Sequence, residues 1–468
     1  MFSLQSIVAR NRFGLGTIES DGELSDPRGW LSAQLAPQSA LPPSLAGLPG
    51  TLAAMAATEE IIQARKAARM DAAGADTPAI AARDAQGDTL AGLYAQQVMA
   101  RFAAAVVTTT PFRERLVHFW TNHFAVSAEK VRVKMLVGSF EIEAIRAHLD
   151  GSFSDMLAGA VQHPAMLLYL DNVMSFGPNS SFVQRRQGNT ARTLGLNENL
   201  AREILELYTL GVRTGYSQTD VTELARAITG WSVVEDRPQF AKLMEPGLNN
   251  FAYYPPMHEP GRRRLLGKAY DEEGQRQGLA MLRDLGSHPA TAHHIATKLV
   301  RHFVADDPPP RAVVKIERAF AASHGHLPSI HRALISLDEV WATNAQPKYK
   351  TPWEYVVSVG RLAGLPDFKP GKLVAMFAQM GQAVYMPGAP AGWPDVSANW
   401  LSSDGLSKRI QFATEVAHIQ ASHIDARAQA ERAFGPQLTG STRLAIDRAE
   451  SGQQALTLLL ASPEMMWR

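Results

Sequence analysis

Carboxylates crowded on two neighbouring predicted helices form the clearest chemical signal in the sequence. Apolar residues recur with helical spacing at 197–210 and at 219–229, and a short connection with Gly211 and Gly215 separates the two segments. Helices joined by so short a connection pack antiparallel. Five carboxylates and two arginines could then face one another across the pair, namely Glu198, Arg202, Glu203, Glu206, Asp220, Glu223 and Arg226.

This crowding has two interpretations, and the sequence leaves both open. Desolvation or like charge could raise the pKa of one carboxyl, which would give a general acid beside a general base, or the carboxylate oxygens could bind a divalent cation. Alternatively, Arg202 and Arg226 pair with the carboxylates in a structural cluster, because exposed ion pairs are common on helices and contribute little. In the first interpretation the two arginines orient the carboxylates or bind an anionic substrate.

Histidines supply the other candidates for proton transfer. His123 ends a segment rich in aromatic residues, 119–124, where a hydrogen-bonded core histidine is the alternative. His118 precedes it by about 500° of helix, so the two side chains diverge and are not expected to share a metal ion. His258 lies beside 259–261, near the tip or shoulder of an expected hairpin, where a side chain can be held toward a cleft.

A later helix, expected at 290–304, carries further nitrogen groups on one stripe. His294, Lys298 and His302 follow one another at i, i+4 and i+8, so they share a face of that helix. The stripe could bind anions or a metal ion. A solvated or interface face is the alternative.

Two tryptophans lie beside turn-forming residues, where an aromatic ring could contact a ligand. Trp231 follows Gly230, and Trp393 lies in the segment 392–395, Gly-Trp-Pro-Asp. A flat apolar ring complements the C–H surface of a sugar, so both tryptophans could bind a glycan-like substrate. Anchoring in the core is the alternative for both.

The composition narrows the classes of function. Lys and Arg total 46 and Asp and Glu 45, so no bulk field would gather nucleic acid, and no nucleic-acid reading motif is present. Cysteine is absent, which removes disulfides, thiolate ligands and a cysteine nucleophile. No Walker loop, Gly-rich dinucleotide turn, His-Glu-x-x-His or Gly-x-Ser-x-Gly motif occurs, so the common nucleotide-binding and serine-hydrolase templates lose weight.

Neither a secretory signal nor a membrane span is expected. The first 20 residues lack a continuous apolar core, so a cytoplasmic location is expected by default, with the periplasm left open. Apolar runs such as 103–107 and 166–170 are far shorter than the ~20 residues that span a bilayer.

The elements that must position these side chains are mostly helices. Helical spacing predicts a mainly α fold, a multi-helix globular bundle with a short β-hairpin, and the hairpin is expected from the extended runs 251–258 and 263–269. A mobile loop is expected near 74–87. The predicted helices are 52–73, 89–108, 112–124, 131–148, 197–210, 219–229 and 290–304.

Three parts are predicted along the chain of 468 residues. Residues 1–88 form an N-terminal helical extension with an Ala-rich segment. Residues 89–345 form a core helical domain with the acidic helices and histidines, and residues 346–468 form a C-terminal helical lobe packed on that core. The basic loop near Arg185 and Arg186 is a candidate contact for another protein.

An ordered series of motifs over nearly the whole chain resembles the bacterial family catalogued as domain of unknown function 1800. The motifs are Glu114-Arg115-Leu116-Val117, Phe119-Trp120, Asn122-His123-Phe124, His163-Pro164-Ala165-Met166, 197–211, 220–231, His258 with Leu265-Leu266-Gly267, 288–292, Lys298 with 301–308, Met380-Gly381-Gln382, Gly392-Trp393-Pro394-Asp395 and Ala461-Ser462-Pro463-Glu464.

The resemblance implies a mostly helical fold and no assured activity. Members of the family are often encoded beside a second uncharacterised family that resembles sulfatases, which implies work on an envelope component or polymer. One departure concerns the acidic helix, where the family often has Glu-Leu-His and this chain has Glu206-Leu207-Tyr208. If that histidine is a metal ligand in the family, Tyr208 weakens or alters the site here.

Two hypotheses follow. In the first, the protein is a hydrolase or lyase that acts on a glycan-like polysaccharide by acid–base or cation-assisted chemistry. Its cleft would then be lined by Glu203, Glu206, Asp220, Glu223, His123 and His258. In the second, the protein is a non-catalytic scaffold or partner of a co-encoded sulfatase-like protein, and the acidic helices form an ion-paired core in which Glu203→Gln would lower stability.

Overall fold

Helices carry most of the chain, as the sequence predicts. The structure is a computed structural model, and it describes residues 2–71, 78–186, 195–234, 242–342, 345–364 and 368–468. Within those residues the strands form only two small antiparallel sheets. The fold is therefore mainly α with a short β-hairpin.

The N-terminal part packs against the C-terminal end of the chain. The Asn11 amide donates to the carbonyl of Ala433 at 3.0 Å, and the Arg12 guanidinium donates to the carbonyl of Arg468 at 2.7 Å. One large apolar core contains residues from Val8 to Met466, and a small second cluster is formed by Leu45, Ala100 and Ala104. The N-terminal elements are α1 (Leu4–Val8), the π-helix η1 (Ala9–Phe13), α2 (Pro27–Ala33) and α3 (Pro43–Ala46).

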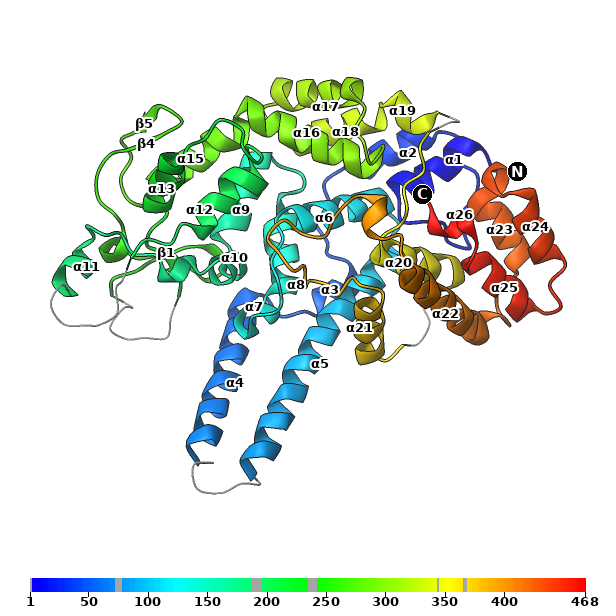
Figure 1. The fold of residues 1–468 in the computed structure, drawn as a ribbon, viewed down its shortest axis with the longest axis horizontal. Coiled ribbons are helices and arrows are strands. Elements are labelled where there is room, and N and C mark those ends of the chain that lie inside the picture. The colour runs from blue at the N-terminus through cyan, green and yellow to red at the C-terminus, as the bar shows by residue number, and fades with distance from the viewer. Residues whose placement is uncertain (1, 72–77, 187–194, 235–241, 343–344, 365–367) are drawn as a thin grey trace.

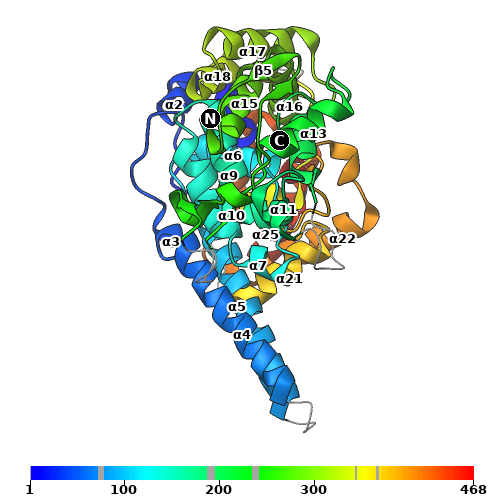
Figure 2. The ribbon, with the colours of Figure 1, turned by 90° about the vertical axis from the view of Figure 1, so that its left-hand side faces the viewer.

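Two long helices, α4 (Thr51–Asp71) and α5 (Pro78–Val107), form a hairpin that projects from the body in both views (Figure 1, Figure 2). The loop expected at 74–87 is therefore wrong from Pro78 onward, where a proline begins a helix, while 72–77 lie outside the described residues. Within α5, the stretch Thr89–Val107 is long and apolar enough to cross a membrane, but 61% of its most apolar window is buried inside the protein, as in a core helix.

The centre of the molecule is built around α6 (Pro111–His123), which is buried along nearly its whole length. Pro111 begins this helix at the position where proline costs no hydrogen bond. The elements after it are α7 (Val131–Lys134), α8 (Val137–Phe140), η3 (Glu141–Ile145), η4 (Arg146–His148), α9 (Phe153–Gln162), α10 (Pro164–Tyr169), η5 (Asn172–Met174) and α11 (Ser181–Arg186). The single helix predicted at 131–148 is thus wrong, because the chain makes four short helical pieces there.

The acidic segments pack side by side as the short connection predicts, but the first helix is not regular. It runs as α12 (Asn199–Glu203) and continues as the π-helix η6 (Ile204–Tyr208). The Thr209 hydroxyl bonds to the carbonyl of Ile204 at 2.6 Å. The second helix is α13 (Gln218–Ala227), which begins with a capping box formed by Ser217 and Asp220.

The strands differ from the predicted pairing. Residues 251–253 form β3 (Phe251–Tyr253), which lies between β1 (Trp231–Val233) and β2 (Glu245–Pro246). The hairpin is instead β4 (Arg263–Leu265) with β5 (Lys268–Tyr270). Leu266 and Gly267 between them both have positive φ, as a tight two-residue hairpin turn requires. The 3-10 turns η7 (Leu248–Asn250) and η8 (Pro255–Met257) flank β3.

The remaining helices cover the centre from two sides (Figure 1). One group comprises α15 (Gln275–Ser287), α16 (Pro289–Phe303), α17 (Pro310–Ala322), α18 (Leu327–Ile335) and α19 (Asp338–Trp341). The other comprises α20 (Pro352–Ala363), α21 (Pro370–Gln379), η9 (Ser397–Asn399), α22 (Ser403–Gln420), α23 (Ala426–Phe434), η10 (Gly435–Gln437), α24 (Gly440–Asp447), α25 (Gly452–Leu460) and α26 (Pro463–Met466). All residues of α20 are buried, so it lies in the middle of the fold beside α6.

Candidate functional site

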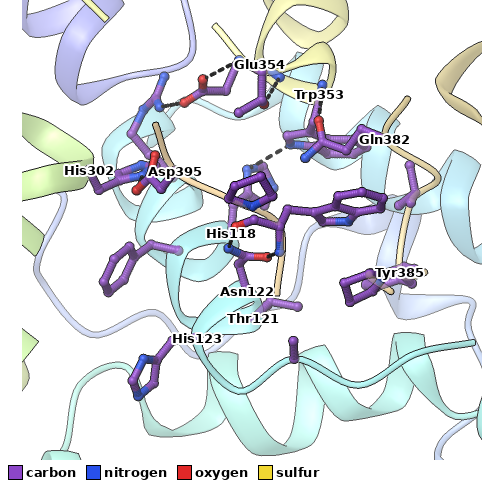
Figure 3. A pocket seen from close by; sticks show the side chains of 18 of the residues that line it. His118, Thr121, Asn122, His123, His302, Trp353, Glu354, Gln382, Tyr385 and Asp395 are labelled. Carbon is purple, nitrogen blue, oxygen red and sulfur yellow. Dashed lines mark hydrogen bonds and ion pairs between the residues drawn. The ribbon is translucent and has the colours of Figure 1, made fainter. Parts of the chain in front are cut away.

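A cavity of about 310 Å³ lies between α6, α16, the start of α20 and the segment 382–396. Such a volume is at the lower end of the range for pockets that hold small ligands. Figure 3 shows Trp353 and Glu354 of α20 above the side chains of α6, with Asp395 beside His302. Stretches of the chain that are far apart in the sequence, including Leu15 and, on α5, Arg101, therefore meet at one hollow.

Asn122 on α6 holds the segment 382–396 in place. Its side-chain amide donates to the carbonyl of Trp393 at 2.9 Å, and its oxygen accepts from the Trp393 N–H at 2.8 Å. Gly392 has φ +78°, and a Cβ there would lie 2.3 Å from the Asn122 carbonyl oxygen, so only glycine fits. The half-buried ring of Trp393 thereby lies at the cavity wall.

His302 and Asp395 form a hydrogen-bonded pair at the cavity (Figure 3). The Nδ1 of His302 lies 2.8 Å from Oδ2 of Asp395. Although burial opposes ionisation, His302 and Lys348 lower the pKa of Asp395 to about 2, so its carboxylate accepts the Nδ1 proton. Burial lowers the pKa of His302, which leaves its ring neutral near pH 7. The buried Nε2 of His302 has no hydrogen-bond partner in the described part of the chain.

Lys348 holds the His302–Asp395 pair in place through Asp395. Its ammonium donates to the carbonyl of Asp395 at 2.9 Å and to the Asp306 carboxylate at 2.8 Å. Asp306 in turn accepts from the backbone N–H of Ser397 at 2.9 Å. The His302–Asp395 pair is therefore held by a network of charge-assisted hydrogen bonds, which fixes the orientation of the imidazole.

Lys298 lies one turn before His302 on α16 and also lines the cavity. No hydrogen bond or ion pair joins its ammonium to any residue that the structure describes. Burial lowers the pKa of Lys298 to about 8, with Asp395 opposing the shift and Arg301 adding to it. A lysine with this pKa can exchange its proton near neutral pH.

Glu354 is the most strongly paired carboxylate of the site. It contacts the guanidinium of Arg115 and lies 2.9 Å from Nε of Arg468, and all three side chains are buried. Burial opposes ionisation, but the two arginines hold the pKa of Glu354 well below its usual range. The other oxygen of Glu354 accepts from the Thr351 N–H at 2.9 Å and so completes the capping box of α20.

Trp353 forms an aromatic wall that other side chains hold in place. Its indole N–H donates to Nδ1 of His118 at 3.1 Å, and its backbone N–H donates to the Gln382 side-chain oxygen at 2.8 Å. The second nitrogen of His118 lies 3.3 Å from Glu114. The Arg101 guanidinium lies 4.6 Å from the centre of the Trp353 ring. His118 thus positions Trp353 by accepting the hydrogen bond of its indole N–H.

Of the residues predicted from the sequence, His123, Lys298, His302 and Trp393 line this cavity. The Nε2–H of His123 donates to the carbonyl of Tyr208 at 3.1 Å, at the end of η6. Tyr208 itself is completely buried. Burial lowers the pKa of His123 well below its usual value, and its buried Nδ1 has no partner in the described structure.

The carboxylates of α12 and η6 do not line the cavity and are mostly paired locally. Arg202 lies 3.3 Å from Glu198 and 3.6 Å from Glu206, and Glu198 also accepts from the Thr222 hydroxyl at 2.7 Å. Glu203 has no hydrogen bond or ion pair with any described residue. Partial burial and the nearby Glu206 raise the pKa of Glu203.

The carboxylates of α13 have structural partners. Asp220 completes the capping box and accepts from the Leu266 N–H at 2.7 Å, so it ties α13 to the β4–β5 hairpin. Glu223 lies 2.6 Å from Arg226 and 3.6 Å from Arg263. These contacts give Asp220 and Glu223 a role in holding the region together.

The remaining predicted residues lie near α13. The Nδ1–H of His258 donates to the carbonyl of Thr229 at 3.0 Å, and burial lowers the pKa of His258. Trp231 is 0% exposed and packs in the core, so its ring has no face open to a sugar in this structure. The structure therefore separates His258 and the acidic helices from the central cavity, which His123 and Trp393 line.

Sequence reasoning missed several cavity residues. Arg115, Arg301, Gln382 and Asp395 were not singled out, although each lies in a segment that carries the family resemblance. Those segments could have identified the cavity residues, because they are far apart in the sequence yet meet at the cavity. Glu354 lies outside them and carried no such signal.

The predicted divalent cation remains a proposal. Within the described ranges, no three His, Asp or Glu side chains are grouped so that they could hold a metal ion.

The fold and the site define a mainly helical protein whose central cavity is lined by charged and aromatic side chains from these motifs. The chain belongs to the family described as Protein of unknown function (DUF1800), which it matches over residues 8–467. No curated protein and no solved structure matches the chain.

Proposed function

We propose that the protein is an enzyme, a hydrolase or lyase that acts on a glycan-like polymer, with its reaction centre in the central cavity. The observation that carries the proposal is a pair of nitrogen groups one helical turn apart on α16. His302 and Lys298 both line the cavity, and neither the Nε2 of His302 nor the ammonium of Lys298 has a partner in the described chain.

The two groups differ in protonation, as a base and an acid must. Asp395 holds the Nδ1 proton of His302, so the lone pair on Nε2 is the basic site. Lys298, with a pKa of about 8, is mostly in its ammonium form at pH 7 and can donate a proton. Acid–base catalysis typically uses two neighbouring groups whose surroundings shift their pKa values so that one acts as the acid and the other as the base.

The same pair serves either reaction class. In hydrolysis, His302 takes a proton from water as the water oxygen bonds to the anomeric carbon, the glycosidic C–O bond breaks, and Lys298 protonates the leaving oxygen. In elimination, His302 takes the proton from the carbon next to a carboxyl group, a C=C bond forms as the C–O bond at the adjacent carbon breaks, and Lys298 protonates the leaving oxygen. The walls formed by Trp393 and Phe119 suit the C–H face of a sugar.

A panel of neutral, carboxylated and sulfated polysaccharides tests the proposal. New reducing ends would report hydrolysis, and ultraviolet absorbance of unsaturated ends would report elimination. We expect turnover of at least one polymer and a loss of about 10²- to 10⁴-fold in kcat for His302→Asn. The exposed His423, whose side chain makes no contact recorded in the described structure, gives the matched control His423→Asn, which should keep full activity.

Two results would contradict the proposal. One is an unchanged rate in folded His302→Asn, especially with loss of activity in His258→Asn, which would move the reaction to the region of α13. The other is the absence of turnover on every polymer. In that case, co-purification with a sulfatase-like protein would favour the scaffold hypothesis.

A further inference from the structure

The walls of the central cavity carry more positive than negative charge. Four cationic side chains line it, from α5, α6 and α16, and only two carboxylates do. The cations are Arg101, Arg115, Lys298 and Arg301, and the carboxylates are Glu354 and Asp395. Charge that is withdrawn from bulk water is costly unless an opposite charge lies close to it.

Two of the four cations already have counter-ions within the protein. Arg115 contacts Glu354, and Arg101 lies 2.7 Å from the buried carboxylate of Glu141. These two arginines are thereby ion-paired and held against the wall.

The two cations on α16 have none. The Nε of Arg301 donates to the backbone carbonyl of Asp306 at 3.3 Å, but no described carboxylate lies within ion-pair distance of Arg301 or Lys298. Asp395, the carboxylate that acts on Lys298, is engaged by His302 and Lys348. Lys298 and Arg301 are therefore the cavity cations without an ion pair among the described residues.

We propose that Arg301 and Lys298 bind an anionic group of the substrate, so that the cavity recognises a sugar ring bearing a carboxylate or a sulfate ester. This inference rests on the proposed function for the location of the site, but binding does not require turnover. Both groups present the same chemistry, an oxyanion that accepts charge-assisted hydrogen bonds from an ammonium and a guanidinium.

The rest of the cavity suits the ring that carries the anion. The side-chain oxygen of Gln382 accepts from the backbone N–H of Trp353. The side-chain nitrogen of Gln382 is left as a donor with no partner among the described residues. Trp393 supplies an apolar face at the same wall. An amide donor, an aromatic face and a cation pair together fit one polar ring with one acidic substituent.

Protonation of Lys298 makes the recognition depend on pH. Its ammonium is faced by His123 from α6, by His294 and Arg301 from its own helix and by Asp395 from the 382–396 segment. Both histidines have lowered pKa values and are neutral near pH 7. As pH rises through about 8, Lys298 loses its charge, and anion binding should weaken.

Calorimetric titration of the full chain tests the inference with four probes. Galacturonate carries a carboxylate, galactose 6-sulfate carries a sulfate ester, galactose is the neutral match, and inorganic phosphate is a free anion. We expect at least one of the two acidic sugars to bind about tenfold or more tighter than galactose. The preferred probe identifies the anionic group.

Variants assign the binding to the two cations. Arg301→Gln and Lys298→Gln should each weaken binding of the preferred acidic sugar about ten- to hundredfold, and Lys298→Gln should remove the loss of affinity above pH 8. Two exposed residues with no side-chain contact in the described structure, Arg318 and Lys369, provide the controls Arg318→Gln and Lys369→Gln. Both controls should bind as the wild type does.

The outcomes separate this inference from the proposed function. Equal affinity for galactose and the acidic sugars, binding of phosphate alone, or unchanged binding in both cation variants would overturn the inference. Turnover of a neutral polymer that needs His302 would then leave the proposed enzyme intact. Conversely, tight binding of an acidic sugar without any turnover would support the anion site and contradict the enzyme.

Discussion

Two regions of the molecule hold clustered carboxylates, and the two regions differ in where the partners of these carboxylates come from. At the central cavity, Glu354 and Asp395 are strongly paired with buried cations that come from distant parts of the chain. On η6 and α13, Glu206 and Glu223 are half-buried and pair with arginines three or four residues away. Carboxylates that cluster along the sequence thus pair with arginines of the same helix, whereas Glu354 and Asp395 pair with groups from distant parts of the chain.

The difference follows from how a helix supplies partners. An arginine at i+3 or i+4 reaches a glutamate on the same face at little cost, so both remain near water and the pair adds little stability. A carboxylate such as Glu354, buried with Arg115 and Arg468, depends on partners that only the complete fold supplies. Such a site should fail strongly when one charge is removed.

The largest effect is expected from removing the charge of Glu354. Glu354→Gln keeps a side-chain oxygen for the capping box but leaves the buried guanidinium groups of Arg115 and Arg468 without their carboxylate. We expect the free energy of unfolding to fall by about 3–5 kcal/mol, measured by urea denaturation.

The matched change on the surface should do almost nothing. Glu450 is exposed, and Glu450→Gln should change the free energy of unfolding by no more than about 0.5 kcal/mol. A loss below about 1 kcal/mol for Glu354→Gln would show that the central region is no more sensitive than the surface, and the contrast between the two regions would disappear.

Much of the fold could be predicted from the sequence, because local patterns determine it. Helical spacing places α4, α6, α13 and α16 within a residue or two of their observed bounds. The broken run at 131–148 could not be predicted, since its middle pieces, α8 and η3, are mostly buried and tertiary packing overrides the local preference there. The strand pairing failed for another reason: Leu266 and Gly267 make a tight turn within a run that was taken as one strand.

The candidate site was less accessible to sequence reasoning. His302 and Lys298 share a face of one helix, and that spacing identified their stripe. Asp395 lies 93 positions from His302, and no local pattern indicates that the two side chains meet. Contacts of this kind depend on the whole fold. The sequence therefore favours the acidic helices, whose charges are crowded along the chain, as the reaction centre over the cavity.

A smaller effect is expected from the pH dependence that Asp395 gives to stability. Its pKa is about 2 in the folded protein, against 3.8 as the ordinary value, so its pairing adds about 2 kcal/mol at neutral pH. Because the folded pKa is depressed, this stability is fully present above about pH 4 and is lost as the pH falls toward 2.

Asp395→Asn isolates that contribution. Urea denaturation between about pH 2 and pH 5 should show a weaker pH dependence in this variant than in the wild type, by about 2 kcal/mol across the window. Asp307 is exposed and provides the control Asp307→Asn, which should follow the wild-type curve. Identical curves for all three proteins would mean that Asp395 is not an ionised, paired group.

The smallest effect on stability is expected at Glu203, and it decides between the two regions. Partial burial and Glu206 raise the pKa of Glu203, so its charged form opposes folding at neutral pH. Glu203→Gln should therefore leave the free energy of unfolding within about 0.5 kcal/mol of the wild type or raise it slightly. The difference in the free energy of unfolding between Glu203→Gln and the wild type should shrink as the pH falls, because the protonated Glu203 is then neutral like the glutamine.

This result would oppose the scaffold hypothesis, which requires Glu203 to be an ion-paired group whose loss lowers stability. It would also give the activity assay a clear meaning. If Glu203→Gln keeps its stability and its rate, the carboxylates of α12 are not the reaction centre, and the cavity with His302 remains. If it keeps its stability but loses about 10²-fold or more in kcat, Glu203 is a general acid, and the chemistry belongs to the acidic helices.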